Sequence, residues 1–317
     1  MTTPRRRGAA LPAQQTPAQQ TPAQPRTNGR ALSHPTLAEP ALAGPTLAEQ
    51  TAAERAAVTG APSEPDGRLS YGTYLRLTQL LAQQVPQADP PAPDELLFIT
   101  VHQVYELWFK QLLCDLEAAR EAMCVGEAWR AKHLLHRVHA VERLMVVQVD
   151  ILETMAPQDF NVFRPVLGPA SGFQSVQYRE LEYLSGVRDQ RFLARHLSLT
   201  DHERERLLYR LSQPTVWDGY LTLLRDRGMT TGSDAEIMAS LRVIAGDRAR
   251  FDDLWQLAED LLTHDELASV WRSRHVSLVE RQIGLRPGTG GSPGAPYLRA
   301  RVPLRYYPLL WQLREYL

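Results

Sequence analysis

The stretch DELLFITVHQVYELWFKQLLCDLEAAREAMCVGEAWRAKHLLHRVHAVERLMVVQVDILETMA, residues 94–156, contains no proline and a single glycine, Gly126. Because proline breaks helices and glycine weakens them, this composition predicts two long helices divided near Gly126. Apolar residues recur at helical spacing in both halves: Leu97, Val101, Val104, Trp108 and Leu112 in the first, and Leu134, Val138, Val141, Met145, Val149 and Leu152 in the second. The stretch therefore predicts a helical core.

Further helical patterns continue toward the end of the chain. They cover residues 176–196, 201–211, 215–227, 234–262, 264–283 and 297–316. The sequence has no convincing run of alternating apolar and polar residues that would indicate strands. We therefore expect one all-α domain over residues 68–317, which is long enough to bury a substantial core.

Residues 1–67 have a different composition. No Phe, Tyr or Trp occurs before Tyr71, and ten of the 23 prolines lie between Pro4 and Pro65. Such a segment cannot bury enough apolar surface to offset the conformational entropy that folding costs. We expect residues 1–67 to form a disordered tail. We do not interpret its three arginines at positions 5–7 as a targeting signal, because no apolar stretch follows them.

The charge balance narrows the kinds of partner. Lys and Arg number 35 against 36 Asp and Glu, and the basic residues are interspersed with acids, so no basic face for nucleic acid is indicated. No apolar run is long enough to cross a membrane. Cys114 and Cys124 lie too far apart along one expected helix to form a disulfide, which fits a reducing cytoplasm. Small-molecule or protein partners are favoured.

The first candidate site lies within the opening stretch. Phe98, His102, Tyr105 and Phe109 follow a 4, 3, 4 spacing, which places one imidazole among three aromatic rings on one helix face. Such a face could line an apolar pocket that has one polar group. It could equally be ordinary core, since a histidine among aromatic residues is more often a buried structural residue.

A second candidate is Phe160-Asn-Val-Phe163-Arg164, which continues to Pro169-Ala-Ser171-Gly172-Phe173-Gln174-Ser175. Its proline and glycine content argues against a regular helix between residues 160 and 175, and places Arg164 on a loop or at a helix start. A guanidinium group can bind a carboxylate through two parallel hydrogen bonds, which suits recognition of a free amino acid. A structural ion pair is an equally good interpretation.

The third candidate pairs a histidine with a loop: Trp271-Arg-Ser-Arg-His275 precedes Gly288-Thr289-Gly290-Gly291-Ser292. A neutral imidazole is a common axial ligand of haem iron, and the absence of a Cys-x-x-Cys-His motif would make that haem non-covalent. On its own, His275 is one of nine histidines and the glycine run could be a flexible connection.

Other catalytic and metal-binding patterns are weaker. The rival histidines His133, His136 and His139 diverge by about 120° between the outer two, which disfavours one metal site and favours a solvated or interface face. No catalytic Ser-His-Asp order, phosphate-binding loop or dinucleotide fingerprint is present.

Together, these three segments, in this order, resemble the tryptophan 2,3-dioxygenase family over residues 71–317. The resemblance implies an all-helical protein that holds one haem b per subunit, with His275 as the axial ligand of the iron. It implies that His102 is the catalytic histidine beside the indole N–H of the substrate, with Phe98 and Phe160 against the indole ring. Ser171 would lie near both the haem and the substrate.

The same resemblance assigns the polar contacts and the assembly. Arg164 would bind the tryptophan carboxylate, and Thr289 would contact its ammonium and carboxylate groups as the glycine-rich loop closes. The family forms homotetramers in which the segment Tyr71-Gly-Thr-Tyr74-Leu75 completes a neighbouring subunit's site. The alternative is an ordinary first helix, with Tyr74 and Leu75 packed within their own subunit. Pro293 stands where a second serine is common, which puts the mobility of the loop in question.

The activity implied is cleavage of the indole C2–C3 bond of L-tryptophan by O2 to give N-formylkynurenine, the first step of the kynurenine route. One alternative is a related haem enzyme that oxygenates a substituted tryptophan in a biosynthetic pathway. Another is a helical protein that binds haem or tryptophan without turnover.

Overall fold

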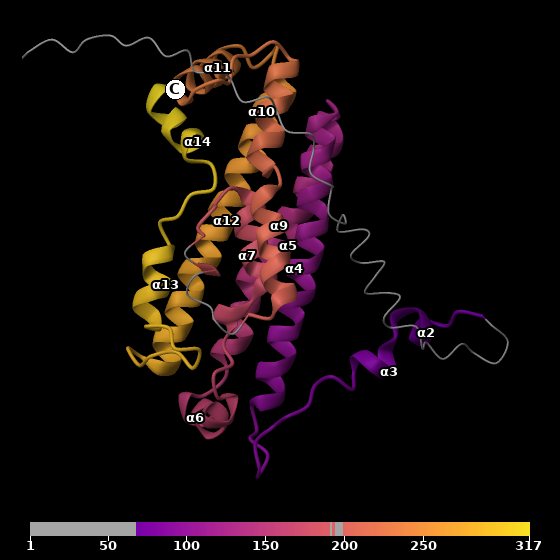
Figure 1. Cartoon of the computed structure of the whole chain (residues 1–317), viewed down its shortest axis with the longest axis vertical. Helices are drawn as coiled ribbons and strands as arrows, with labels where there is room; N and C mark the ends of the chain where they lie inside the picture. Colours follow the sequence, from indigo (N-terminus) through magenta and orange to yellow (C-terminus); the bar gives the residue numbers. More distant parts are fainter. Residues whose placement is uncertain (1–67, 191, 194–198) are drawn as a thin grey trace, which may run out of the picture. The chain divides into compact units, whose positions relative to one another are not determined.

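A computed structural model describes residues 68–190, 192–193 and 199–317. Every regular element in these ranges is a helix and none is a strand, so the all-α prediction is confirmed there (Figure 1). All described residues belong to one compact unit. The expected disordered tail, residues 1–67, lies outside the described residues, and the domain boundary near residue 67 stays a prediction.

Three long helices form the centre of the fold. Helices α4 (Glu95–Cys124) and α5 (Ala128–Glu153) form a hairpin, and α12 (Asp252–Ile283) packs along α5 (Figure 1). The chain turns between α4 and α5 at Gly126, whose φ of 78° lies in the left-handed region that glycine adopts without strain. The predicted division of residues 94–156 into two helices near Gly126 is therefore confirmed.

Shorter helices surround this centre. Helices α7 and α10 pack against α4, α9 packs against α7, and α13 packs against α12. The bounds of the remaining elements are α2 (Tyr71–Leu75), α3 (Leu77–Leu80), α6 (Pro157–Phe163), α7 (Val176–Ser185), α9 (Asp201–Ser212), α10 (Val216–Asp226), α11 (Asp234–Gly246), α13 (Ala295–Arg301) and α14 (Pro308–Gln312), with 3-10 turns η1 (Arg164–Leu167), η2 (Gly172–Gln174) and η3 (Leu313–Tyr316).

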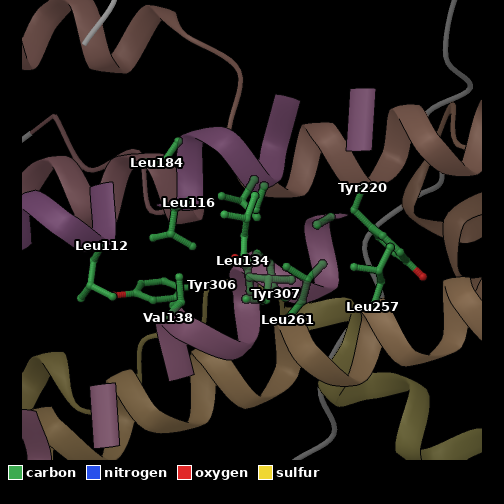
Figure 2. Close-up of a cluster of buried hydrophobic side chains, with 14 of the residues drawn as sticks. Leu112, Leu116, Leu134, Val138, Leu184, Tyr220, Leu257, Leu261, Tyr306 and Tyr307 are labelled. Atoms are coloured by element: carbon green, nitrogen blue, oxygen red, sulfur yellow. The ribbon is translucent and has the colours of Figure 1, made fainter. Parts of the chain in front are cut away.

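The apolar faces of α4, α5, α10, α11 and α12 meet in the main core (Figure 2), and smaller apolar clusters form around Tyr183 and around Phe163. Leu116 of α4, Leu257 and Leu261 of α12 and Tyr307 near the end of the chain are fully buried. Burial of each leucine side chain contributes about 1.5–3 kcal/mol. The apolar spacing seen in the sequence thus corresponds to packing between α4, α5 and α12.

A buried polar cluster also joins helices α5, α7 and α12. His264 of α12 lies within 2.7 Å of Glu142 Oε1 through its Nδ1 and within 2.9 Å of Ser185 Oγ through its Nε2. These partners belong to α5 and α7, and all three side chains are buried. Because a buried polar group without a partner costs more than its hydrogen bond contributes, these contacts restrict how α12 can rotate against α5 and α7.

Several expected helix boundaries were wrong. The two helices expected at 234–262 and 264–283 are instead α11, which ends at Gly246, and the unbroken α12. The division falls at residues 247–251, where the Asp247 carboxylate accepts a hydrogen bond from the Arg250 N–H at 3.3 Å and closes a turn. No glycine or proline occurs near residue 263, so nothing interrupts α12 there.

Glycine and proline shorten two other expected helices. The helix expected at 176–196 ends at Ser185, because Gly186 has a φ of 131° and its backbone packs against the Tyr306 carbonyl, 3.0 Å from where a Cβ would stand. The helix expected at 297–316 is divided into α13, α14 and η3. Pro303 lies in the interruption between α13 and α14, and Pro308 is the first residue of α14.

The segment between residues 157 and 175 contains more helix than expected. No regular helix was expected at residues 160–175, yet Phe160 and Phe163 lie on α6. Pro157 occupies the first turn of α6, where its missing N–H costs nothing. Arg164 lies at the junction of α6 with the 3-10 turn η1, close to the helix boundary that the sequence indicated.

The histidine triplet on α5 is only partly solvated. His133 and His136 are exposed, but His139 is buried and its Nε2 lies 2.9 Å from the Asp260 carbonyl oxygen. The expectation of a solvated or interface face was therefore wrong for His139, which contacts α12 directly. Among the described residues, no helix combines the length and apolarity that crossing a membrane requires.

Candidate active site

A cavity of about 250 Å³ lies between α4, α6, α7, α12 and the glycine-rich loop. Seven side chains singled out in the sequence line it: Phe98, His102, Phe160, Arg164, Ser171, Thr289 and His275. They come from four segments that are far apart along the chain. The fold therefore brings the three candidate motifs together at one site.

His102 presents one defined nitrogen to this cavity. Its Nδ1 lies 2.7 Å from the Phe98 carbonyl oxygen, one turn earlier on α4. A carbonyl oxygen only accepts, so Nδ1 carries the proton and Nε2 keeps its lone pair. Burial lowers the pKa of His102, and this effect outweighs the opposing contributions of the Phe98 hydrogen bond and of Glu106. His102 is thus a neutral imidazole with a free acceptor nitrogen.

Aromatic rings surround His102. The ring centroid of Phe98 lies 4.0 Å from that of His102 and 5.8 Å from that of Phe160. Phe163, which is fully buried, packs at 5.5 Å from Phe98 and fixes α6 against α4. The planes of Phe98 and Phe160 are tilted by 35° to each other, and together these rings form an apolar wall that suits an aromatic ligand.

His275 lies on α12 and faces the same cavity. Its ring stacks on Trp271, one turn earlier, with centroids 5.2 Å apart and planes 26° apart. Desolvation by burial, together with the neighbouring His102, lowers the pKa of His275 to about 4. At neutral pH the imidazole is therefore uncharged and has a lone pair available for a metal ion.

The glycine-rich loop is fastened to the segment that carries Arg164 and Ser171. The Thr289 hydroxyl donates to the Ala170 carbonyl oxygen at 2.6 Å, and Arg164 Nη2 donates to the Pro287 carbonyl oxygen at 2.6 Å. A Cβ on Gly290 would stand 2.7 Å from the Ser171 Cβ. Only glycine allows the loop backbone to approach Ser171 this closely.

Ser171 has a structural contact in this arrangement. Its hydroxyl oxygen caps the 3-10 turn η2 by accepting from the Phe173 N–H at 3.3 Å, and its own N–H donates to Gln174 Oε1 at 3.3 Å. These two bonds hold Ser171 where it borders both the cavity and Gly290.

Three of the candidate residues do not line the cavity of their own subunit. Tyr71, Tyr74 and Leu75 lie on α2 with 77%, 71% and 41% of their surfaces exposed. Tyr74 therefore makes little contact within this chain, whereas more than half of the Leu75 surface is covered. This turn is held locally by Ser70 and Thr73, each of which caps the backbone of the other.

One end of the cavity is polar, a feature that no motif in the sequence indicated. Glu182 of α7 accepts from Arg301 Nη2 at 2.8 Å and from Arg179, and Arg272 of α12 lines the same cavity. Arg179 and Glu182 have the i,i+3 spacing of an exposed helix pair, yet both are buried. The available signal was that Arg272 falls within the Trp271 to His275 motif.

A helical fold that encloses an aromatic cavity, with two neutral imidazoles and a cationic end, defines a protein built to bind a flat aromatic molecule that carries anionic groups. Comparisons with known proteins identify the family. The family model for tryptophan 2,3-dioxygenase matches residues 57–216 and 220–317. The chain belongs to the tryptophan 2,3-dioxygenase family.

Individual relatives agree with this assignment. The chain is 59% identical over 256 residues to a tryptophan 2,3-dioxygenase of Nocardioides sp., covering 80% of this chain and 96% of that protein. It is 38% identical over 256 residues to the tryptophan 2,3-dioxygenase of Herpetosiphon aurantiacus, covering 78% and 97%. It is 39% identical over 259 residues to that of Caulobacter vibrioides, covering 78% and 97%. The similarity spans nearly the whole length of each relative.

Proposed function

We propose that this chain is a haem-dependent dioxygenase that cleaves the indole C2–C3 bond of L-tryptophan with O2 to give N-formylkynurenine. The observation that carries the proposal is the pairing of His102 and His275 in one aromatic cavity closed by the Arg164 and Thr289 segments. Membership of the family supports the same reaction.

The chemistry of the cavity suits one non-covalent haem b. His275 is the candidate axial ligand, because its imidazole is neutral at physiological pH. The aromatic lining suits the flat face of a porphyrin, and the arginines at the polar end suit its carboxylates. When bound, the haem supplies the oxygen chemistry, while the protein supplies orientation and a water-poor site.

His102 is proposed to orient the substrate. Its free Nε2 can accept a hydrogen bond from the indole N–H, while Phe98 and Phe160 pack against the ring. Removal of the indole proton is not its role, because burial makes His102 a weaker base than free imidazole and indole is a very weak acid. The histidine therefore selects the position of the ring.

Arg164 and Thr289 are proposed to bind the amino acid end of tryptophan. Arg164 donates one hydrogen bond to Pro287, which leaves other N–H groups of its guanidinium for a carboxylate. The Thr289 hydroxyl reaches from the loop to the Ala170 carbonyl, so a substrate that binds there exchanges one acceptor for another. Ser171 borders both ligands.

The exposed residues Tyr71, Tyr74 and Leu75 are proposed to complete the pocket of a neighbouring subunit in a homotetramer. Two aromatic side chains with most of their surface exposed on one short helix favour a contact with another chain. The two cysteines, Cys114 and Cys124, are free and exposed, which fits the proposed cytoplasmic location.

The test is turnover by the haem-loaded protein. With L-tryptophan and labelled O2, we expect N-formylkynurenine that carries two labelled oxygen atoms. The absorbance of the product gives the rate, and its mass gives the number of labelled atoms. His275→Ala should leave the protein folded but largely without bound haem, whereas His133→Ala, which removes an exposed histidine of α5, should behave as wild type.

Three results would contradict the proposal. The first is one labelled atom per product, which would indicate a monooxygenase. The second is turnover only of a ring-substituted tryptophan. The third is haem binding without turnover of tryptophan.

A further inference from the structure

Arg272 is a buried cation that has no carboxylate partner among the described residues. Only 4% of its surface is exposed, and it lines the cavity. Its Nη2 donates to the Leu304 carbonyl oxygen at 2.7 Å and its Nη1 to the Tyr306 hydroxyl at 3.4 Å. Its Nε–H is buried without a hydrogen-bond partner. In the part of the chain that the structure describes, Arg272 thus contacts neutral acceptors alone.

The neighbouring acids do not neutralise this charge. Glu182, which lines the cavity, is shared between Arg179 and Arg301. Arg301 also reaches Asp189 at 3.3 Å. The polar end of the cavity therefore has more guanidinium groups than lining carboxylates.

A buried guanidinium without a carboxylate partner is stabilised by a bound anion. A charge taken out of water costs several kcal/mol unless an opposite charge compensates it. Arginine does not escape this cost by losing its proton. Burial acts to lower the pKa of Arg272, but Tyr306, Tyr178 and the nearby carboxylates raise it by more, so the guanidinium stays charged. The missing partner is an anionic group that enters with a ligand.

The position of Arg272 indicates which bound molecule supplies this anion. Arg272 lies three residues before His275 on α12, so the two side chains share one helix face and are about 4.5 Å apart along the axis. The substrate-facing residues His102 and Arg164 belong to other elements. An anion at Arg272 therefore belongs to the molecule that His275 holds.

We propose that Arg272 binds a propionate carboxylate of the haem, so that α12 anchors the cofactor at two points, the iron through His275 and the edge of the porphyrin through Arg272. The proposal rests on the haem dependence proposed above. A guanidinium can hold one carboxylate through two parallel hydrogen bonds, which fixes the rotation of the porphyrin in its plane. The Tyr306 ring, whose centroid lies 5.3 Å from the guanidinium carbon, packs against this side chain in a cation-π contact.

The test pairs a protein variant with a modified cofactor. Apoprotein of the wild type and of Arg272→Gln is titrated with haem and with its dimethyl ester, which has no carboxylates. Arg274→Gln is the matched control, since Arg274 is on the same helix but pairs with Asp150 and Glu153 of α5. Circular dichroism checks that each variant folds.

We expect esterification to weaken binding to the wild type and to Arg274→Gln roughly tenfold or more, the contribution of a charged hydrogen bond. It should weaken binding to Arg272→Gln much less. Equal effects of esterification on all three proteins would overturn the role of Arg272 while leaving haem binding intact. A wild type that binds neither compound would overturn both this inference and the proposed function.

Two further measurements cover the remaining outcomes. If Arg272→Gln does not fold, the wild type and Arg272→Lys are compared. A lysine retains the charge without the bidentate geometry, so the ester penalty should shrink but persist. A wild type that binds the ester as tightly as haem would refute the inference. So would an Arg272→Gln protein with unchanged haem affinity that loses its preference for L-tryptophan over tryptamine, because the anion would then be the substrate carboxylate.

Discussion

The close approach of the glycine-rich loop to Ser171 makes Gly290→Ala a sharp perturbation. The added Cβ would stand 2.7 Å from the Ser171 Cβ and 3.2 Å from its Oγ. Carbon atoms pack at about 3.5–4.0 Å, so the loop must retreat by about 1 Å. The Ser171 Cβ is attached directly to the backbone, which the η2 cap holds in place, so it cannot turn aside as the end of a flexible side chain could.

Overpacking of this kind costs about 1–3 kcal/mol. If tryptophan binds beneath the closed loop, its dissociation constant should rise roughly 5- to 150-fold, because each 1.4 kcal/mol is a factor of ten. The melting temperature should change little, since the loop lies outside the main core. Binding is measured by titrating the ferrous haem-loaded protein with L-tryptophan and following the haem absorbance.

The control is Gly246→Ala at the end of α11, where an added Cβ meets nothing within 4 Å. It should bind tryptophan as the wild type does. If Gly290→Ala bound tryptophan with wild-type affinity, the loop would not close over the substrate against Ser171. The reasoning from the 2.7 Å approach would then be refuted.

Three other changes test the remaining parts of the site and the core. Arg164→Ala should lower kcat/KM for L-tryptophan by at least tens-fold, since loss of one partner of a charge pair that a bound substrate shields from water costs about 2–5 kcal/mol. The loss on tryptamine should be smaller, and equal proportional losses would mean that Arg164 supports structure alone. Tyr74→Ala removes a side chain that is 71% exposed, so the stability of a subunit should change by less than about 0.5 kcal/mol while turnover falls. Normal turnover would argue against a shared pocket. Burial is the main cause that lowers the pKa of His139 from 6.5 to about 4. Between these pH values the unfolded chain binds a proton at His139 that the folded protein does not bind. The free energy of unfolding should therefore decrease as pH falls from 6.5 to 4. Urea unfolding of His139→Gln across this window should show a weaker pH dependence, by up to about 3 kcal/mol, and an unchanged slope would exclude His139 as the cause.

Local patterns in the sequence sufficed for the helices whose ends carry a local signal. Gly126 divides α4 from α5 because the turn needs a left-handed residue, and the apolar spacing on each side is uninterrupted. The division between α11 and α12 was misplaced, because the turn closed by Asp247 is formed by a side chain and no proline marks it. Periodicity alone does not locate such a break.

The candidate site was predictable where a motif held several of its residues together. The seven lining residues singled out beforehand all occur in such motifs. The ion pair of Glu182 with Arg301 spans 119 positions in the sequence, and burial of Arg179 depends on the same partner side chain. Nothing in the local sequence distinguishes these charges from those of a solvated helix, because their environment is made by distant elements.

The unbroken course of α12 links His275 to the dry core. His264, held by Glu142 on one side and Ser185 on the other, lies eleven residues earlier on the same helix. Eleven residues at 100° each come within about 20° of a whole number of turns, so both histidines point in nearly the same direction, about 16 Å apart along the axis. A continuous helix fixes the relative directions of its side chains. The hydrogen bonds of His264 fix the rotation of α12, and so the direction of the His275 side chain three turns later, although His264 itself does not line the cavity.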